Sequence, residues 1–181
     1  MTKEKTTIIG LALLLLGLGI VARLLPHSAN VAPIAAIALF GALYLPKRLA
    51  LILPLCALLL SDLFIGFYSL PIMVTVYGSF LTIGLLGLWI RSHKSFGTVL
   101  GGTLLGSLLF FLTTNAAVCF FGTMYAHTLD GLMQSYTMAL PFFRNSVLGD
   151  LFYTGILVGS MELLLRYLPT GILAKEPEQI S

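Results

Sequence analysis

Charged residues are scarce in this chain. Lys, Arg, Asp and Glu make up 9% of its 181 residues, whereas 58% are hydrophobic and the mean hydropathy is +1.01. Because soluble domains carry about 25% charged residues, this composition excludes a soluble domain and predicts an integral membrane protein. In a membrane protein, basic residues mainly mark the loops that lie in the cytoplasm. The net charge of +3 therefore does not indicate a nucleic-acid partner.

Cysteine and the common catalytic motifs are also lacking. The two cysteines, Cys56 and Cys119, lie inside apolar segments, which excludes a disulfide framework and a CxxC metal site. The chain contains no Walker A phosphate loop, no HExxH and no GxSxG. We therefore predict that the protein is not an enzyme, and we expect no catalytic residue, metal or cofactor.

Long apolar runs are what the sequence has instead. A helix needs about 20 apolar residues to cross a bilayer, so the runs predict an all-α, polytopic membrane protein. We expect a single transmembrane domain (residues 1–181) that ends in a polar tail at 169–181. Its six spans are residues 7–25, 31–45, 49–67, 70–90, 96–121 and 146–168. The second is short and carries Pro33 in its first turn, so we expect it to be tilted or only partly spanning.

The basic residues favour one orientation. With six spans and a cytoplasmic N-terminus, eight of the ten lie inside and only Arg23 and Arg144 lie outside. The inner ones are Lys3, Lys5, Lys47, Arg48, Arg91, Lys94, Arg166 and Lys175. This bias predicts cytoplasmic N- and C-termini. The first span is preceded by lysines, as in a signal peptide, but its length favours a retained anchor.

Polar side chains gather at one depth near the predicted outer face. The rise of about 1.5 Å per residue brings these residues to a common level: Arg23, His27, Asn30, Asp62, Asn115, Arg144, Asn145 and Asp150. Asp150 lies within an apolar run, where an unpaired carboxylate would cost several kcal/mol. We therefore expect a cationic partner for it, with Arg23 the nearest in depth and Arg144 second.

Each polar residue also has a simpler interpretation. The two arginines could snorkel toward lipid headgroups, and Asp62, Asn30 and Asn145 could cap helices. Aromatic residues such as Tyr68 crowd the same level, which fits either an interfacial belt or the walls of a small-molecule pocket. The outer connection 122–143 is polar enough for a short amphipathic lid on the membrane surface.

Small residues recur at four-residue spacing. Gly97 with Gly101, Gly102 with Gly106, Gly155 with Gly159, Ala32 with Ala36, and Ala38 with Ala42 all follow this pattern. Such spacing lets helices approach closely in lipid. Packing within a six-helix bundle is one interpretation, and docking of another membrane subunit on the alanine face of the second span is the other.

Several segments carry a family resemblance. RLLPHSANVAPIAAIALFGALYLPKR, LPLCALLLSDLFIGFY and LPFFRNSVLGDLFYTGILVG resemble an uncharacterised family of small bacterial integral membrane proteins, over roughly residues 23–159. More distantly, six short helices with polar outer loops look like the substrate-binding S-components of energy-coupling-factor vitamin transporters. That likeness implies an S-component-like bundle with an outward-facing pocket for a vitamin, metal or similar micronutrient. It also implies a transmembrane coupling subunit driven by ATPases, facing Ala32, Ala36, Ala38 and Ala42.

Our leading hypothesis is therefore a membrane protein that binds a small solute and acts in its uptake, alone or within a larger transporter. The expected substrate-binding residues are Arg23, His27, Asn30, Asp62, Tyr68, Asn115, Arg144, Asn145 and Asp150. The alternative is an accessory or scaffold subunit that transports nothing, in which the outer polar groups form a structural network.

Overall fold

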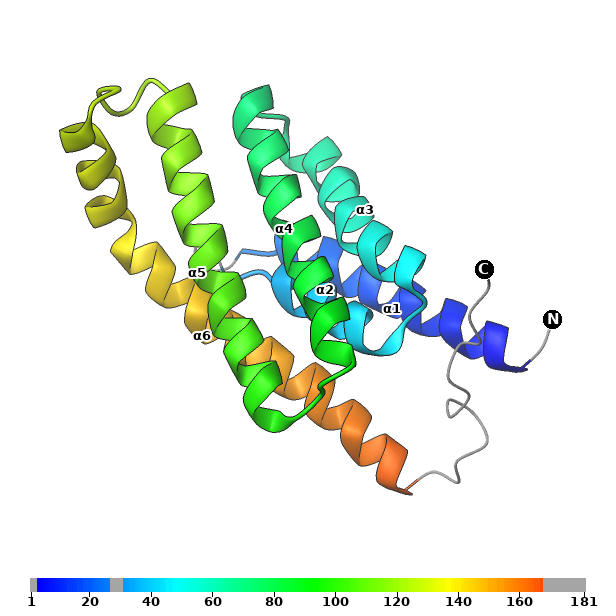
Figure 1. Ribbon diagram of the computed structural model, residues 1–181. Helices are drawn as coiled ribbons and strands as arrows, with labels where there is room; N and C mark the ends of the chain where they lie inside the picture. Colours follow the sequence, from blue (N-terminus) through cyan, green and yellow to red (C-terminus); the bar gives the residue numbers. More distant parts are fainter. Residues whose placement is uncertain (1–2, 27–30, 168–181) are drawn as a thin grey trace.

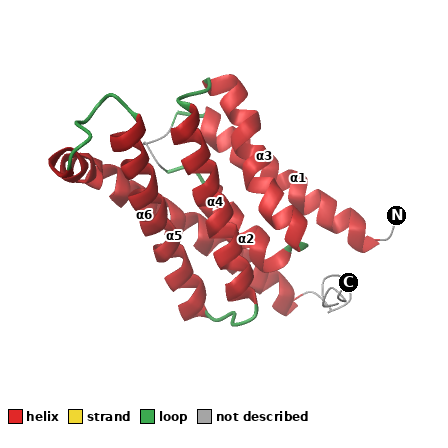
Figure 2. Ribbon diagram, turned by 45° about the horizontal axis from the view of Figure 1, so that its top comes forward, coloured by secondary structure: helices red, strands yellow, loops and turns green. Residues whose placement is uncertain are grey.

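The computed structural model describes residues 3–26 and 31–167, and every regular element in these ranges is a helix (Figures 1 and 2). The six helices are α1 (Lys3–Leu24), α2 (Ile34–Tyr44), α3 (Lys47–Ile65), α4 (Leu70–Arg91), α5 (Phe96–Phe121) and α6 (Leu129–Tyr167). The all-α prediction is confirmed. The predicted fifth span coincides with α5, and the predicted third and fourth spans lie within two residues of α3 and α4.

Local sequence explains several of these boundaries. The Ser95 side chain accepts a hydrogen bond from the Thr98 backbone N–H, and Thr98 bonds back to Ser95, so a capping box starts α5. Pro71 stands in the first turn of α4, where its missing N–H is tolerated. Helix α3 stops at Gly66, whose φ of 106° is readily available only to glycine.

Helix α2 lies at the centre of the bundle. Every residue from 34 to 43 is buried, and α2 contacts each of the other five helices. Its 11 residues rise about 16 Å, roughly half of a 30 Å hydrocarbon layer. The predicted second span is therefore a short core helix, in agreement with the expectation that it spans only in part.

Helix α2 ends inside the protein because Arg91 satisfies its last carbonyl groups. Arg91 reaches across from the end of α4 and donates to the backbone oxygens of Ala42 and Leu45. These carbonyls belong to the last turn of a helix and would otherwise lack partners in an apolar setting. A basic residue here also complements the negative end of the α2 dipole.

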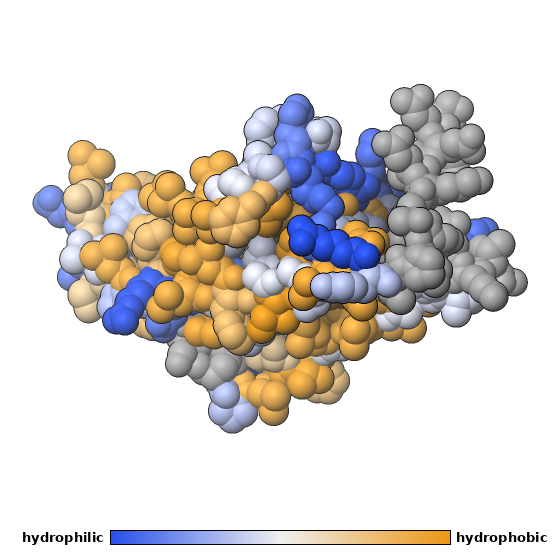
Figure 3. Space-filling view, turned by 90° about the horizontal axis from the view of Figure 1, so that it is seen from below, coloured by the Kyte–Doolittle hydropathy of each residue, from blue (hydrophilic) through white to orange (hydrophobic). Residues whose placement is uncertain are grey.

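The other five helices are long and apolar enough to cross a membrane. Large hydrophobic side chains such as Leu13, Val74, Leu105 and Phe152 are exposed on their outer surfaces. Figure 3 shows one such face, on which apolar residues cover most of the described surface and hydrophilic residues form separate patches. A surface of this kind is stable against lipid rather than water, so the chain is a multi-pass membrane protein.

Helix α6 departs most from the sequence prediction. A span was expected to begin at residue 146 after a separate surface lid, but α6 begins at Leu129 and continues for 39 residues. It contains Pro141 and changes direction in its first half without ending (Figure 1). Its first part packs on α5, because Ser135 donates to the backbone oxygen of Asn115 and Tyr136 donates to that of Leu112. This segment is the start of the last helix, not a separate lid.

The small residues are divided between the interior and the surface. Ala36, Ala38 and Ala42 are at most 1% exposed, and Ala32 is half-buried, so the chain's own helices cover this face of α2. Gly102 and Gly106 pack against Ile90 and Ile83 of α4. The structure thus favours packing within the bundle over docking of a partner on the alanine face. By contrast, a side chain at Gly101, Gly155 or Gly159 would meet open space.

Gly87 of α4 provides a test of this packing. A Cβ at this position would lie 2.6 Å from the Cβ of Ala42 and 3.3 Å from the backbone oxygen of Leu39, so α2 would have to move. We expect Gly87→Ala to lower the free energy of unfolding by about 1–3 kcal/mol through overpacking. Gly78→Ala, in open space on the same helix, is the matched control. Equal thermal unfolding midpoints for the two variants in detergent would show that α2 and α4 are not closely packed.

Candidate functional site

Three helices bring together a buried ion pair. Asp62 of α3 is fully buried, accepts a hydrogen bond from the Arg23 guanidinium of α1, and accepts another from the Tyr77 hydroxyl of α4 at 2.8 Å. Tyr68, in the connection between α3 and α4, lies close by. Burial first, and then the charge of Asp62, raise the pKa of Tyr68 above its usual value, while the charge of Arg23 lowers it. Arg23, Asp62 and Tyr68 therefore lie close together, and their role in substrate binding stays a prediction.

Asp150 lies apart from this pair, contrary to the expectation that Arg23 or Arg144 would neutralise it. Its side chain accepts a hydrogen bond from the Ser107 hydroxyl of α5 at 2.7 Å. The ion pairs in the described ranges are Arg23 with Asp62 and Lys94 with Glu162, so no described cation pairs with Asp150. Asp150 is nevertheless only 6% exposed.

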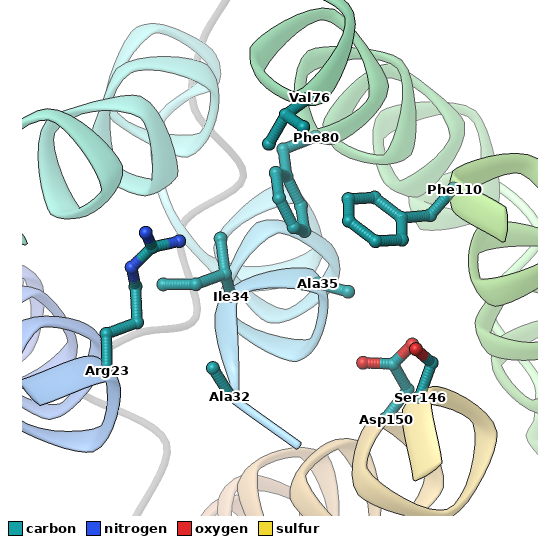
Figure 4. A pocket seen from close by; sticks show the side chains of 9 residues that line it. All are labelled: Arg23, Ala32, Ile34, Ala35, Val76, Phe80, Phe110, Ser146 and Asp150. Carbon is teal, nitrogen blue, oxygen red and sulfur yellow. The ribbon is translucent and has the colours of Figure 1, made fainter. Parts of the chain in front are cut away.

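A cavity of about 90 Å³ separates Arg23 from Asp150 (Figure 4). Its polar lining residues are Arg23, Ser146 and Asp150. The apolar walls are Ala32, Ile34, Ala35, Val76, Phe80 and Phe110, contributed by the segment before α2 and by α2, α4 and α5. Figure 4 shows Asp150 and Ser146 side by side, across the cavity from Arg23. Gly149 allows α6 to approach the segment before α2 closely, because a Cβ at this position would lie 3.2 Å from the Cα of Val31.

A second, smaller space adjoins the other side of Asp150. It measures about 10 Å³, close to the minimum for one water molecule, and Asp150 and Thr154 of α6 both line it. The Thr154 hydroxyl is buried and has no hydrogen-bond partner among the described residues. Since buried polar groups are rarely left unpaired, the surroundings of Asp150 have hydrogen-bonding capacity that the described side chains do not fill.

Asn115, Arg144 and Asn145 are not among the residues that line the cavity. Asn115 donates to the backbone oxygen of Phe111 in its own helix, at 2.8 Å. Arg144 is exposed and Asn145 is half-buried, and neither is among the lining residues. His27 and Asn30 lie outside the described residues.

Several contributors were missed by sequence reasoning. Tyr77, Ser107, Ser146 and Thr154 are single hydroxyl-bearing residues within apolar spans, and Phe80 and Phe110 are ordinary apolar residues of spans. Because the sequence prediction concentrated on charged and amide side chains at one depth, these residues gave it no signal. Helical spacing offered one clue, since Ser146, Asp150 and Thr154 recur every four residues and share a face of α6.

The lining of the cavity is mixed in character. It combines apolar and aromatic walls with a few polar groups, which is the usual make-up of a small-molecule site. In the described part of the chain, no group of three or more His, Cys, Asp or Glu side chains could hold a metal ion.

Comparison with known proteins yields a family but no characterised relative. No curated protein and no solved structure matches the chain. These two searches therefore lend no support to the resemblance to S-components. One family model, described as a family of unknown function (DUF6580), matches residues 2–171. This match covers nearly the whole chain and agrees with the expected uncharacterised family, and the protein therefore belongs to the DUF6580 family.

Proposed function

We propose that the protein binds a small polar solute within the membrane and takes part in its uptake. The observation that carries the proposal is the cavity between Arg23 and Asp150 (Figure 4). Ionisable groups inside a membrane are costly, and those lining a cavity are the usual markers of a solute or ion pathway. Asp150 in particular is buried without a described counter-charge, which is costly unless a ligand or a proton compensates it.

The direction of uptake follows from the basic residues. Lys47, Arg91, Lys94 and Arg166 lie near the helix ends remote from the cavity, whereas Arg23 and Asp62 lie near the other ends. By the positive-inside rule, the end near the cavity faces outward and both termini are cytoplasmic, in a bacterial inner membrane. The cavity would then take its solute from the outside.

The volume of the cavity limits the solute. Sites for drug-sized ligands measure about 300–1,000 Å³, and a cavity of about 150 Å³ holds benzene. At about 90 Å³, this cavity suits a molecule smaller than benzene. A vitamin, as an S-component-like role would require, fits only if the surrounding helices separate. Coupling to a transmembrane subunit and ATPases rests on the sequence resemblance alone.

Filling the cavity tests the proposal. Ala32 is half-buried and lines the space, so Ala32→Leu should occupy it with little disturbance of the core. We expect native mass spectrometry to detect a co-purified or added small solute on the unmodified protein, and Ala32→Leu to abolish it. Ala116→Leu, at a half-buried position on α5 away from the cavity, should retain the solute. Equal occupancy in both variants would contradict binding at this cavity.

An accessory or scaffold role is the second candidate, and one observation favours it. Asp62 accepts hydrogen bonds from both Arg23 and Tyr77 within the chain, as it would in a purely structural network. Lys94, Glu162 and Tyr44 do the same at the opposite ends of the helices. If no small molecule in a broad panel binds or stabilises the protein, while the cavity variant folds normally, the scaffold role is the better account.

A further inference from the structure

We infer that the solute held beside Asp150 is a small ammonium compound with an oxygen acceptor at its other end. This inference rests on the proposed function and specifies its substrate class. The first argument is charge. Arg23 is neutralised by Asp62, which leaves Asp150 as the uncompensated charge among the described residues that line the cavity. A site with a net negative charge between membrane-spanning helices attracts a cation and repels an anion.

The groups around Asp150 match the needs of an ammonium ion. Its three N–H donors require acceptors, and the Asp150 carboxylate supplies the strongest. The Ser146 hydroxyl lines the cavity beside it and donates its own proton to the backbone oxygen of Phe142, so its lone pairs remain available. Ser107 donates to Asp150, which holds the carboxylate in position.

Aromatic rings form another wall of the same cavity. Phe80 and Phe110 lie with their ring centroids 5.0 Å apart, and both line the space. Figure 4 shows the two rings next to each other, above Ala35 in this view. The faces of such rings attract cations, and the attraction grows when water is excluded. The same ring faces give an anionic solute no comparable attraction.

The opposite end of the cavity supplies a donor. Arg23 lines this end, and only one of its guanidinium nitrogens donates to Asp62, so the group has further N–H donors. An oxygen on the solute would accept a hydrogen bond from this guanidinium, whereas a purely apolar tail would not. Together with the volume of about 90 Å³, these groups describe a molecule about the size of ethanolamine or glycine.

Four probes of similar size separate the possibilities. Ethanolamine carries an ammonium and a hydroxyl, glycine an ammonium and a carboxylate, ethylene glycol two hydroxyls, and acetate only a carboxylate. We expect ethanolamine or glycine to raise the thermal unfolding midpoint of the full-length protein in detergent, with a Kd at least about tenfold below those of ethylene glycol and acetate. Sodium chloride at the same concentration is the ionic control.

Two variants localise the effect. Asp150→Asn keeps the shape of the side chain but removes its charge, and it should weaken binding of the ammonium probe by about 10–100-fold. Glu162→Gln removes a carboxylate at the far helix ends, outside the cavity, and should leave binding unchanged. The midpoint of each variant without a probe reports whether it folds.

The outcomes also separate this inference from the proposed function. Equal stabilisation by sodium chloride, by ethylene glycol or by acetate would overturn the ammonium assignment. If in that case Ala32→Leu abolished binding of the effective probe, solute binding at the cavity would stand. Ammonium binding that survived Asp150→Asn would overturn the assignment of Asp150. If none of the probes bound and no solute from a broader panel did, both would fail.

Discussion

Replacing Asp62 by asparagine should be among the most destabilising single changes in the chain. Asp62 is fully buried and accepts hydrogen bonds from Arg23 and Tyr77. Removing one partner of a buried ion pair costs about 3–5 kcal/mol, because the other charge remains uncompensated. The Arg23 side chain keeps 18% of its surface exposed, so its charge can move toward the membrane surface. We therefore expect the free energy of unfolding to fall by about 3 kcal/mol. The midpoint of thermal unfolding in detergent should fall by about 6–12 °C.

Asp150→Asn is the matched control for this prediction. Asp150 is also a buried aspartate on a transmembrane helix, but it has no ion pair among the described residues, and Ser107 can donate to an amide oxygen as it does to the carboxylate. We expect its unfolding midpoint to stay within about 2–4 °C of the unmodified protein. Similar losses for Asp62→Asn and Asp150→Asn would contradict the arrangement of charges described here.

The contrast between the two aspartates shows what the sequence could and could not predict. Depth along each helix follows from the rise per residue, so Arg23 and Asp62 were correctly placed near the same helix ends, whereas Asp150 lies midway along α6, beside Ser107 near the middle of α5. Pairing depends also on the direction in which each helix face points and on which helices are neighbours. Helix α1 packs against α3, so Arg23 reaches Asp62, while the cavity separates it from Asp150.

Helix boundaries were likewise predictable only where the local sequence determines them. α5 was predicted at its observed bounds because its apolar run is long and uninterrupted, and in the structure a capping box at Ser95 starts it. α6 was predicted to begin 17 residues too late, at 146 instead of Leu129. Its first part is polar and contains Pro141, two features that normally indicate a loop. Contacts with α5 through Ser135 and Tyr136 stabilise the helix there, and such tertiary contacts are not visible in a local sequence pattern.

The cavity itself was only partly predictable. Arg23 and Asp150 attracted attention as charges inside apolar runs, but the sequence gave no measure of the space between them. That space exists because α2 is short and because Ala35 of α2 and Ala32 just before it carry small side chains, so their neighbours approach without filling the centre. The position of α2 is thus a condition for the candidate site, and the residues that fix its ends become important for function.

Arg91→Met should therefore affect both stability and solute binding. Arg91 holds the C-terminal end of α2 by donating to the backbone oxygens of Ala42 and Leu45. Methionine keeps much of the apolar stem but no donor, so two carbonyls are left unpaired in an apolar interior. At about 1–3 kcal/mol for each unsatisfied group, with partial rearrangement, the expected loss in the free energy of unfolding is about 2–4 kcal/mol. Hydrogen exchange of the α2 amides should accelerate more than that of α5.

Two comparisons show whether this effect comes from capping. Arg48→Met removes an exposed basic residue at the start of α3 and should leave both stability and exchange nearly unchanged. Arg91→Lys should recover only part of the loss, because one ammonium group does not reproduce the spread of guanidinium donors over two carbonyls. If Arg91→Met behaved like Arg48→Met, α2 would be held by apolar packing alone. If instead α2 exchanged faster and solute binding weakened together, the capped end of this short helix would control the cavity that lies beyond its other end.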